Sequence, residues 1–199
     1  MYKKALIVYG TRFGATASTS GEIASVLRNE GLDVRAINAK KGKIQDISGY
    51  DLIIIGSGMM IDRWTREPEK FLQKFRKELA IKKVALFVSS GAQALIEYEG
   101  KVTDFHFGGK TIVLVGAEAT GRARKKYLED KAAKYNLQPV ALGFLGGIFD
   151  YNHMPWWSGK AMSATKLQLK TAGFKEVKPG VYDTRDWNAI RNWAKELAA

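Results

Sequence analysis

Small and hydroxyl-bearing residues follow the first apolar run of the chain. Ala5-Leu6-Ile7-Val8 is typical of a buried strand, and Thr11-Arg12-Phe13-Gly14-Ala15-Thr16 comes shortly after it. Apolar side chains then recur at helical spacing, so we expect the loop to open a helix. Free backbone N–H groups and the positive end of the helix dipole would meet there, and two hydroxyls and a guanidinium add donors. These residues predict a phosphate-binding loop.

Two common nucleotide loops do not fit these residues. A Walker A loop needs GK[ST], which this loop lacks. A dinucleotide fingerprint needs G-x-G-x-x-G and an acid about 20 positions on. Gly10 and Gly14 have the wrong spacing, and Asn38 stands near the place of the acid. The loop therefore holds another kind of phosphate ligand, or it is simply a good turn.

The elements around the loop read as alternating buried strands and helices. Continuous apolar runs predict core strands, and the alternating run at 32–37 predicts an edge strand. We expect strands at 5–8, 32–37, 52–55, 84–88, 111–115 and 140–142. We expect one helix after the first loop, a second that begins near Pro68, a third over 123–135 and a fourth that begins after Thr184 or Asp186. The pattern predicts an α/β fold, a doubly wound parallel sheet of order 2-1-3-4-5 with helices on both faces. Residues 92–110 would be an insertion, a short helix or part of a hairpin.

Length and composition set the broad class of the protein. The 199 residues, 46% of them hydrophobic, fit one domain spanning 1–199. No window approaches the roughly 20 apolar residues of a membrane span. With no cysteine, disulfides, thiol nucleophiles and cysteine metal sites are excluded, and we expect a cytoplasmic location. The formal charge of +12 favours an anionic partner; no nucleic-acid motif accompanies it, so no nucleic acid is expected.

Ligands of such sheets bind beyond the carboxyl ends of the strands. The loops that leave these ends are 10–16, 56–66 and 89–99, and all three are rich in Gly, Ser or Thr. The second also carries Met59, Met60 and Trp64. A phosphate loop beside two small-residue loops with an aromatic side chain predicts a site for a phosphorylated planar ring.

The same residues resemble a known family. Thr11-Arg12-x-Gly14-x-Thr16 after a first strand resembles the FMN-phosphate loop of the flavodoxin superfamily. More narrowly, this motif resembles the flavodoxin-type, quinone-dependent protoporphyrinogen IX dehydrogenases, as do Tyr50 to Ser57 and Tyr182-Asp183-Thr184-Arg185-Asp186-Trp187. The resemblance implies a flavodoxin-like fold and FMN as cofactor. Phe13 departs from the small or polar residue usual in such loops.

The resemblance also implies which residues contact FMN. The phosphate would lie in the first loop, between residues from Thr11 to Thr16, and the other two loops would flank the ring. The implied residues are Thr11, Arg12, Phe13, Gly14, Ala15, Thr16, Ser57, Gly58, Met59, Met60, Trp64, Ser89, Ser90, Gly91 and Ala92. Trp64 either stacks on the flavin or covers the loop. No general acid or base is named, and His106 and His153 lack ligand-like neighbours, so no metal site is predicted.

Two functions of different class remain open. One is an enzyme that passes electrons from an organic substrate through FMN to a quinone, with peripheral contact to an anionic membrane. The other is an electron-transfer carrier that docks with a redox partner protein. Trp156 and Trp157, beside several lysines, suit a membrane interface or a partner surface, or they cover the far edge of the sheet. A third reading is a binding module that keeps the fold without flavin.

Overall fold

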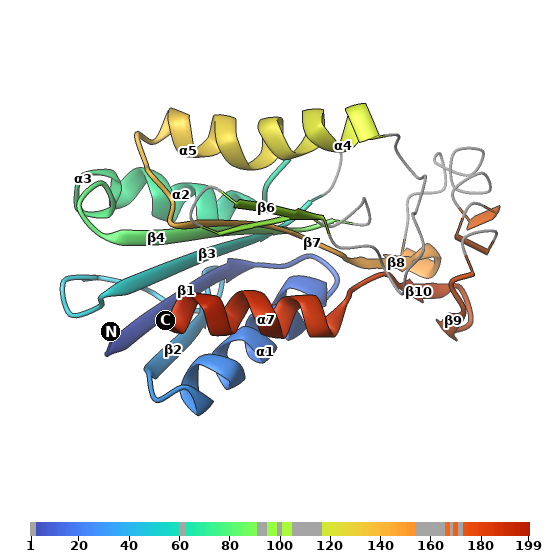
Figure 1. The fold of residues 1–199 in the computed structure, drawn as a ribbon, viewed down its shortest axis with the longest axis horizontal. Coiled ribbons are helices and arrows are strands. Elements are labelled where there is room, and N and C mark those ends of the chain that lie inside the picture. Colours follow the sequence, from blue (N-terminus) through green and yellow to red (C-terminus); the bar gives the residue numbers. More distant parts are fainter. Residues whose placement is uncertain are drawn as a thin grey trace.

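A parallel sheet forms the centre of the molecule. The computed structural model describes residues 3–59, 63–90, 95–98, 101–104, 117–153, 166–167, 169–170 and 173–199. Five strands pair in parallel in the order β2-β1-β3-β4-β7, which confirms the predicted 2-1-3-4-5 topology (Figure 1). They are β1 Lys4–Gly10, β2 Asp33–Asn38, β3 Leu52–Gly58, β4 Lys83–Ser89 and β7 Ala141–Leu145.

Helices cover both faces of the sheet, as predicted. One layer holds α2, α3, α4 and α5, and the other holds α1 and α7 (Figure 1). The helices are α1 Ala15–Asn29, α2 Arg66–Lys74, α3 Arg76–Leu79, α4 Ala117–Arg124, α5 Asp130–Lys134 and α7 Trp187–Ala198, with a π-helical turn Lys125–Glu129 between α4 and α5. Asp186 caps α7 by accepting from the Ala189 N–H at 3.0 Å, so of the two predicted caps the aspartate is confirmed. No helix that the structure describes is long and apolar enough to cross a bilayer.

Burial follows the hydropathy of each strand. β3 and β4 are buried along nearly their whole length, because both faces of a doubly wound sheet lie under helices. β2 buries only Val34 and Ile37, one toward each apolar cluster, because it lies at the edge. The sheet separates two apolar clusters, one under α1 and α7 and the other under α2 and the α4–α5 layer. This packing holds the carboxyl ends of β1, β3 and β4 at one rigid edge.

The segment between β4 and α4 extends the sheet. β5 Leu95–Tyr98 and β6 Lys101–Asp104 form an antiparallel hairpin, and β5 pairs with β7. Of the three alternatives for residues 92–110, the hairpin is therefore the one found. The strand predicted at 111–115 and the tryptophan pair Trp156–Trp157 lie outside the described residues.

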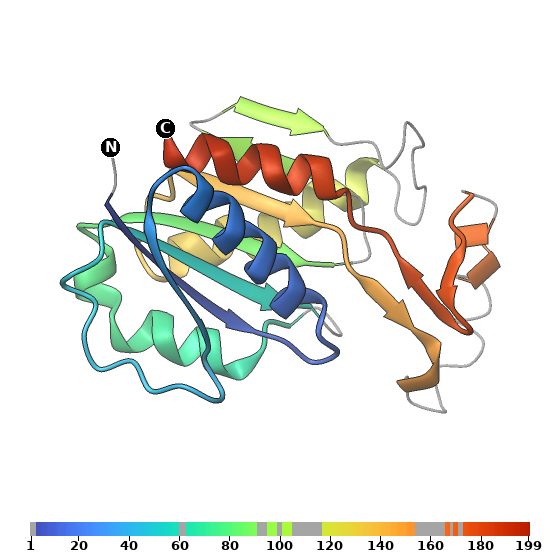
Figure 2. The ribbon, with the colours of Figure 1, turned by 90° about the horizontal axis from the view of Figure 1, so that it is seen from below.

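A second, small sheet lies beyond the carboxyl ends of the parallel strands (Figure 2). It consists of β8 Ile148–Asp150, β9 Glu176–Lys178 and β10 Val181–Asp183, in the order β8-β10-β9, and leads directly into α7. Sequence patterning did not predict it, since three-residue strands show no readable period.

Glu176 secures the β9–β10 turn and makes it sensitive to acid. The Gly180 N–H, Lys166 and the Tyr182 hydroxyl all bond this carboxylate, and together they lower the pKa of Glu176 from 4.5 to about 2. A carboxylate with a lowered pKa stabilises the fold above its unfolded-state pKa and loses that effect as pH falls. We expect the Gly180 amide resonance of the folded protein to titrate with a midpoint near pH 2, and Glu176→Gln to abolish the shift. Equal titrations in the two proteins would contradict this.

Candidate functional site

The predicted phosphate loop forms an open cradle at the start of α1. Gly14 is the N-cap residue and has a φ of +91°, a left-handed conformation that glycine adopts without strain. Its N–H donates to Thr11 Oγ1 at 2.9 Å, which fixes the turn and leaves the threonine O–H as a donor. No side chain caps the helix, and its first turn holds no acidic residue. The first backbone N–H groups of α1 are thus available to an anion.

The second loop lies against this cradle. A Cβ on Gly58 would come within 3.0 Å of Thr16 Oγ1 and within 3.9 Å of the Arg12 backbone nitrogen. The absence of a side chain at Gly58 lets the carboxyl end of β3 approach the loop this closely. The structure therefore brings together the ends of β1 and β3, as the strand order predicts.

Ser57 has a structural partner within the same edge. Its Oγ accepts from the Thr65 N–H at 2.8 Å and lies 3.0 Å from Thr65 Oγ1. Both residues are buried. Ser57 thus ties the end of β3 to the N-cap of α2. Thr65 was missed in the sequence reading, although a threonine directly before a helix is a recognisable N-cap signal.

Trp64 lies in the core. Its side chain is 4% exposed, and its Nε1 donates to the Tyr127 carbonyl at 2.9 Å in the π-helical turn. The Lys131 Nζ lies 5.5 Å from the centroid of the Trp64 ring. Of the two roles predicted for Trp64, this geometry favours covering the loop over stacking on a ring.

The third loop begins at Ser89 and Ser90. The Ser89 carbonyl accepts from the Met59 N–H at 3.1 Å, so the ends of β3 and β4 are linked. Ser89 Oγ is buried and, among the described residues, is one of five buried side-chain polar atoms without a hydrogen-bond partner. An orphaned hydroxyl at a ligand edge is a donor or acceptor for a bound polar group. Met60, Gly91 and Ala92 lie outside the described residues.

Phe13 points outward from the loop. Its side chain is 46% exposed, and its ring centroid lies 6.3 Å from that of His153. His153 belongs to the 3₁₀ turn Tyr151–His153 after β8, where its Nδ1 is 2.7 Å from Asp150 Oδ2. The turn that follows β8 of the small sheet therefore lies close to Phe13 of the phosphate loop.

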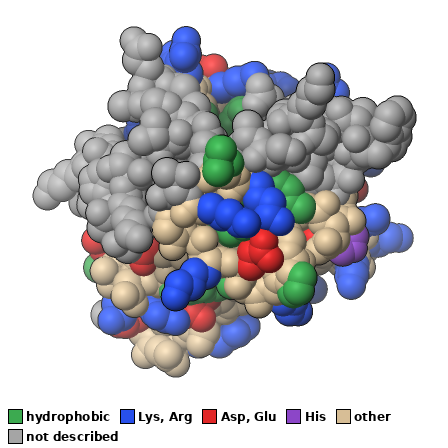
Figure 3. All heavy atoms as spheres, turned by 90° about the vertical axis from the view of Figure 1, so that its right-hand side faces the viewer, with side chains coloured by type: hydrophobic (Ala, Val, Ile, Leu, Met, Phe, Trp, Pro, Cys, Tyr) green, Lys and Arg blue, Asp and Glu red, His purple; other side chains and the backbone are tan. Residues whose placement is uncertain are grey.

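A basic cleft of about 470 Å³ lies beside the cradle, in the range of volumes of small-molecule sites. Six cations and two carboxylates line it, and Figure 3 shows basic side chains gathered on this face of the molecule. The lining residues are Thr11, Arg12, Lys40, Arg63, Trp64, Thr65, Arg66, Glu67, Glu69, Lys126, Tyr127 and Lys131. Lys131 pairs with Glu69, which leaves an excess of positive charge in the cleft.

The C-terminal segment also reaches the cradle. Arg185 donates to the Ala15 carbonyl at 3.2 Å and to Ser18 Oγ. Residues 170 positions apart in the chain meet here, so no local sequence pattern could have revealed the contact.

The observed features fit a phosphorylated flavin such as FMN. The open N–H donors and the absence of an acid suit a phosphate dianion, and a Cβ added at Gly14 would meet nothing within 4 Å. The orphaned Ser89 hydroxyl lies at the edge where a ring would be placed.

Comparison with known proteins identifies the family of this chain. A flavodoxin domain model, Flavodoxin_5, matches residues 6–171. A flavodoxin of Clostridium beijerinckii is 33% identical over 87 residues, which are 43% of this chain and 63% of that flavodoxin. The chain thus matches under two thirds of that relative's length.

Solved structures show a similar architecture. The chain resembles a short-chain flavodoxin associated with a non-canonical PDU bacterial microcompartment, with a TM-score of 0.54 and 11% identity over 99% of both chains. It also resembles the oxidised flavodoxin 1 of Bacillus cereus, with a TM-score of 0.48 and 14% identity over 85% of this chain and 98% of that one.

Flavodoxins bind FMN and transfer electrons to redox partner proteins. The match to the flavodoxin domain model covers the first loop, the three strand ends and the cleft described above. This protein therefore belongs to the flavodoxin family.

Proposed function

We propose that this chain binds FMN at the carboxyl edge of its parallel sheet and transfers electrons through it. The observation that carries the proposal is the start of α1, uncapped and free of acidic residues, beside the ends of β3 and β4. Residues 11–16 would hold the phosphate, Ser57 to Met60 and Ser89 to Ala92 would flank the ring, and Trp64 would cover the loop. This assignment of the FMN site still includes Phe13, Met60, Gly91 and Ala92.

The flavin would supply the redox chemistry. The chain's own residues bind the phosphate, orient the ring and limit water around it. Ser57 and Thr65 hold the β3 end and the α2 N-cap in one arrangement, which keeps the two walls of the site at a fixed distance.

An FMN titration tests the proposal. We expect purified protein to bind FMN at micromolar concentration, with quenched flavin fluorescence and a shifted absorbance band. Riboflavin, which lacks the phosphate, is expected to bind more weakly because it cannot use the cradle. Absence of FMN binding at these concentrations would overturn the proposal.

The basic cleft supports an anionic electron donor or acceptor. Positive charge around a redox site raises the encounter rate with acidic partners. We expect the double variant Lys40→Glu/Arg63→Glu to slow oxidation of the reduced protein by ferricyanide, an anionic oxidant, by roughly tenfold at low salt. The effect should fade as salt screens the charges.

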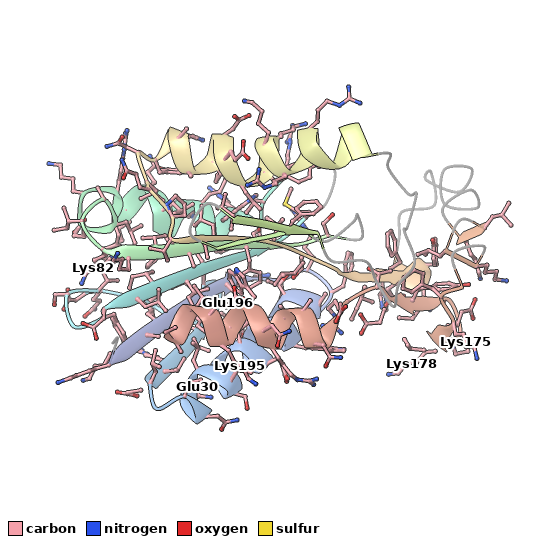
Figure 4. The ribbon with its side chains drawn as sticks, in the orientation of Figure 1. Glu30, Lys82, Lys175, Lys178, Lys195 and Glu196 are labelled. Atoms are coloured by element: carbon pink, nitrogen blue, oxygen red, sulfur yellow. The ribbon has the colours of Figure 1, made fainter. Side chains whose placement is uncertain are left out.

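Lys195→Glu is the control for Lys40→Glu alone, because each of these single variants changes the net charge by the same amount. Lys195 is an exposed lysine on α7, away from the cleft (Figure 4). Reversal of its charge is expected to leave the ferricyanide rate within a factor of about two. Similar slowing in both proteins would show that net charge, rather than the cleft, controls the encounter.

A second candidate function is oxidation of an organic acid with a quinone as acceptor, as in the protoporphyrinogen dehydrogenases. The small sheet favours it, because the exposed Val177 of β9 lies in the chain between Lys175 and Lys178, which are at the ligand end of the molecule (Figure 4). Such a surface also suits peripheral contact with an anionic membrane. Anaerobic mixing of the FMN-loaded protein with protoporphyrinogen tests it: flavin reduction, followed by reoxidation by a quinone, would support the enzyme, and no reduction would leave the electron carrier.

A further inference from the structure

Arg185 connects three parts of the chain beside the phosphate loop. Its Nε and Nη2 donate to the Asp183 carboxylate at 2.8 and 2.6 Å. Its Nη1 donates to the Ala15 carbonyl and to Ser18 Oγ in the first turn of α1, and the Trp187 ring lies 4.3 Å from the guanidinium carbon. The Arg185 side chain is 5% exposed. Four of its five N–H donors are therefore used inside the fold.

The backbone that carries Arg185 is itself held firmly. Thr184 is buried and exchanges hydrogen bonds with both backbone groups of Gly147, after β7. Asp186 caps α7 on the other side. A side chain between two such anchors loses little further freedom when it forms its contacts.

The Ser18 hydroxyl continues the network toward the cradle. It accepts from Arg185 and lies 3.0 Å from the Ala15 carbonyl and 3.3 Å from the Gly14 carbonyl, to which it donates. Gly14 and Ala15 are the residues at which the loop turns into α1. Arg185 thus braces the turn whose N–H groups face the proposed phosphate.

Charge alone does not explain this arrangement. The Asp183 carboxylate forms a two-pronged contact with the guanidinium and cancels most of its charge beyond a few ångströms. If Arg185 attracted phosphate by its charge alone, removal of Asp183 would therefore strengthen phosphate binding. If Arg185 instead holds the turn in position, removal of Asp183 would weaken phosphate binding. The two roles predict opposite signs for the same substitution.

We propose that Arg185 is a positioning residue for phosphate binding, acting from a segment that lies beyond the matched flavodoxin domain region. The inference rests on the proposed FMN site. It implies that the C-terminal segment aligns the first turn of α1. Arg185 would therefore affect binding of the cofactor's phosphate and not of its ring.

The test compares FMN with riboflavin in titrations of flavin fluorescence. We expect Arg185→Gln and Asp183→Asn each to weaken FMN binding about tenfold, the effect of losing one hydrogen-bonded charged group, with riboflavin changed by less than about twofold. Arg185→Lys should restore little, because a single ammonium cannot replace the planar fork. If Arg185→Gln fails to fold, Asp183→Asn and Arg185→Lys still give the answer.

Arg191→Gln is the matched control. Arg191, on α7, bonds Glu22 of α1 and thus links the C-terminal segment to α1 away from the loop. We expect it to leave the ratio of FMN to riboflavin affinity unchanged, even if the melting temperature falls. Tighter FMN binding by Asp183→Asn, or equal loss of both flavins in Arg185→Gln, would overturn the inference. Failure of wild-type protein to bind FMN would instead overturn the proposed function.

Discussion

Ala15→Glu is expected to weaken FMN binding by about 100-fold or more while the protein stays folded. A carboxylate about 5 Å from the phosphate costs about 3 kcal/mol at the effective dielectric of a protein surface, which corresponds to this factor. The same carboxylate favours the helix, because an acidic side chain in a first turn gains about 0.3–1 kcal/mol from the dipole. The first turn of α1 contains no such residue, although helix stability would favour one.

Ala15→Gln separates charge from size in this experiment. The amide has nearly the shape of the carboxylate and lacks its charge, so we expect at most a modest loss of FMN affinity. Riboflavin affinity should differ little between the two variants, and both should melt at or above the wild-type temperature. Equal loss of FMN in Ala15→Gln and Ala15→Glu would show that crowding, and not phosphate repulsion, is responsible.

Gly56→Ala is expected to destabilise the fold by about 3 kcal/mol, at the upper end of overpacking effects. A Cβ at this position in β3 would lie 2.1 Å from Phe87 Cζ. The Phe87 ring is fully buried and packs edge-on against Trp193 at 6.0 Å, so it has no space into which to withdraw. Urea unfolding of the two proteins measures the difference.

Gly21→Ala should change the stability in the opposite direction. Gly21 lies within α1, and a Cβ there would meet nothing within 4 Å. Alanine in a helix is favoured over glycine by about 1 kcal/mol. If Gly21→Ala stabilises the fold and Gly56→Ala destabilises it, the loss in Gly56→Ala comes from the Phe87 contact. If both variants are destabilised, this explanation is contradicted.

Local patterns were enough to predict the fold. The apolar runs of β1, β3 and β4 are continuous because both faces of the sheet are covered, whereas β2, at the edge, buries only Val34 and Ile37. When strands alternate with helices, the connections between parallel strands are almost always right-handed, which leaves few possible strand orders. The hairpin β5–β6 stayed ambiguous because its four-residue strands are too short to show a period.

The candidate site was predictable in part for the same reason. The phosphate loop is contiguous in the chain, so its glycine, its hydroxyls and the following helix could be read together. Ser57 and Trp64 were named from the sequence, but their hydrogen-bond partners Thr65 and Tyr127 were not foreseen. A hydrogen-bond partner depends on how two elements pack, which residue types alone do not specify.

The amino-acid sequence by itself determined the parallel sheet and the excess of positive charge and predicted the phosphate loop, because each arises from residue types at short spacing. Only the tertiary structure decided that Trp64 packs inside, that six cations surround one cleft, and that Arg185 braces the first turn of α1. Those features join residues far apart in the chain, and their contacts exist only after the sheet has brought the strand ends to one edge.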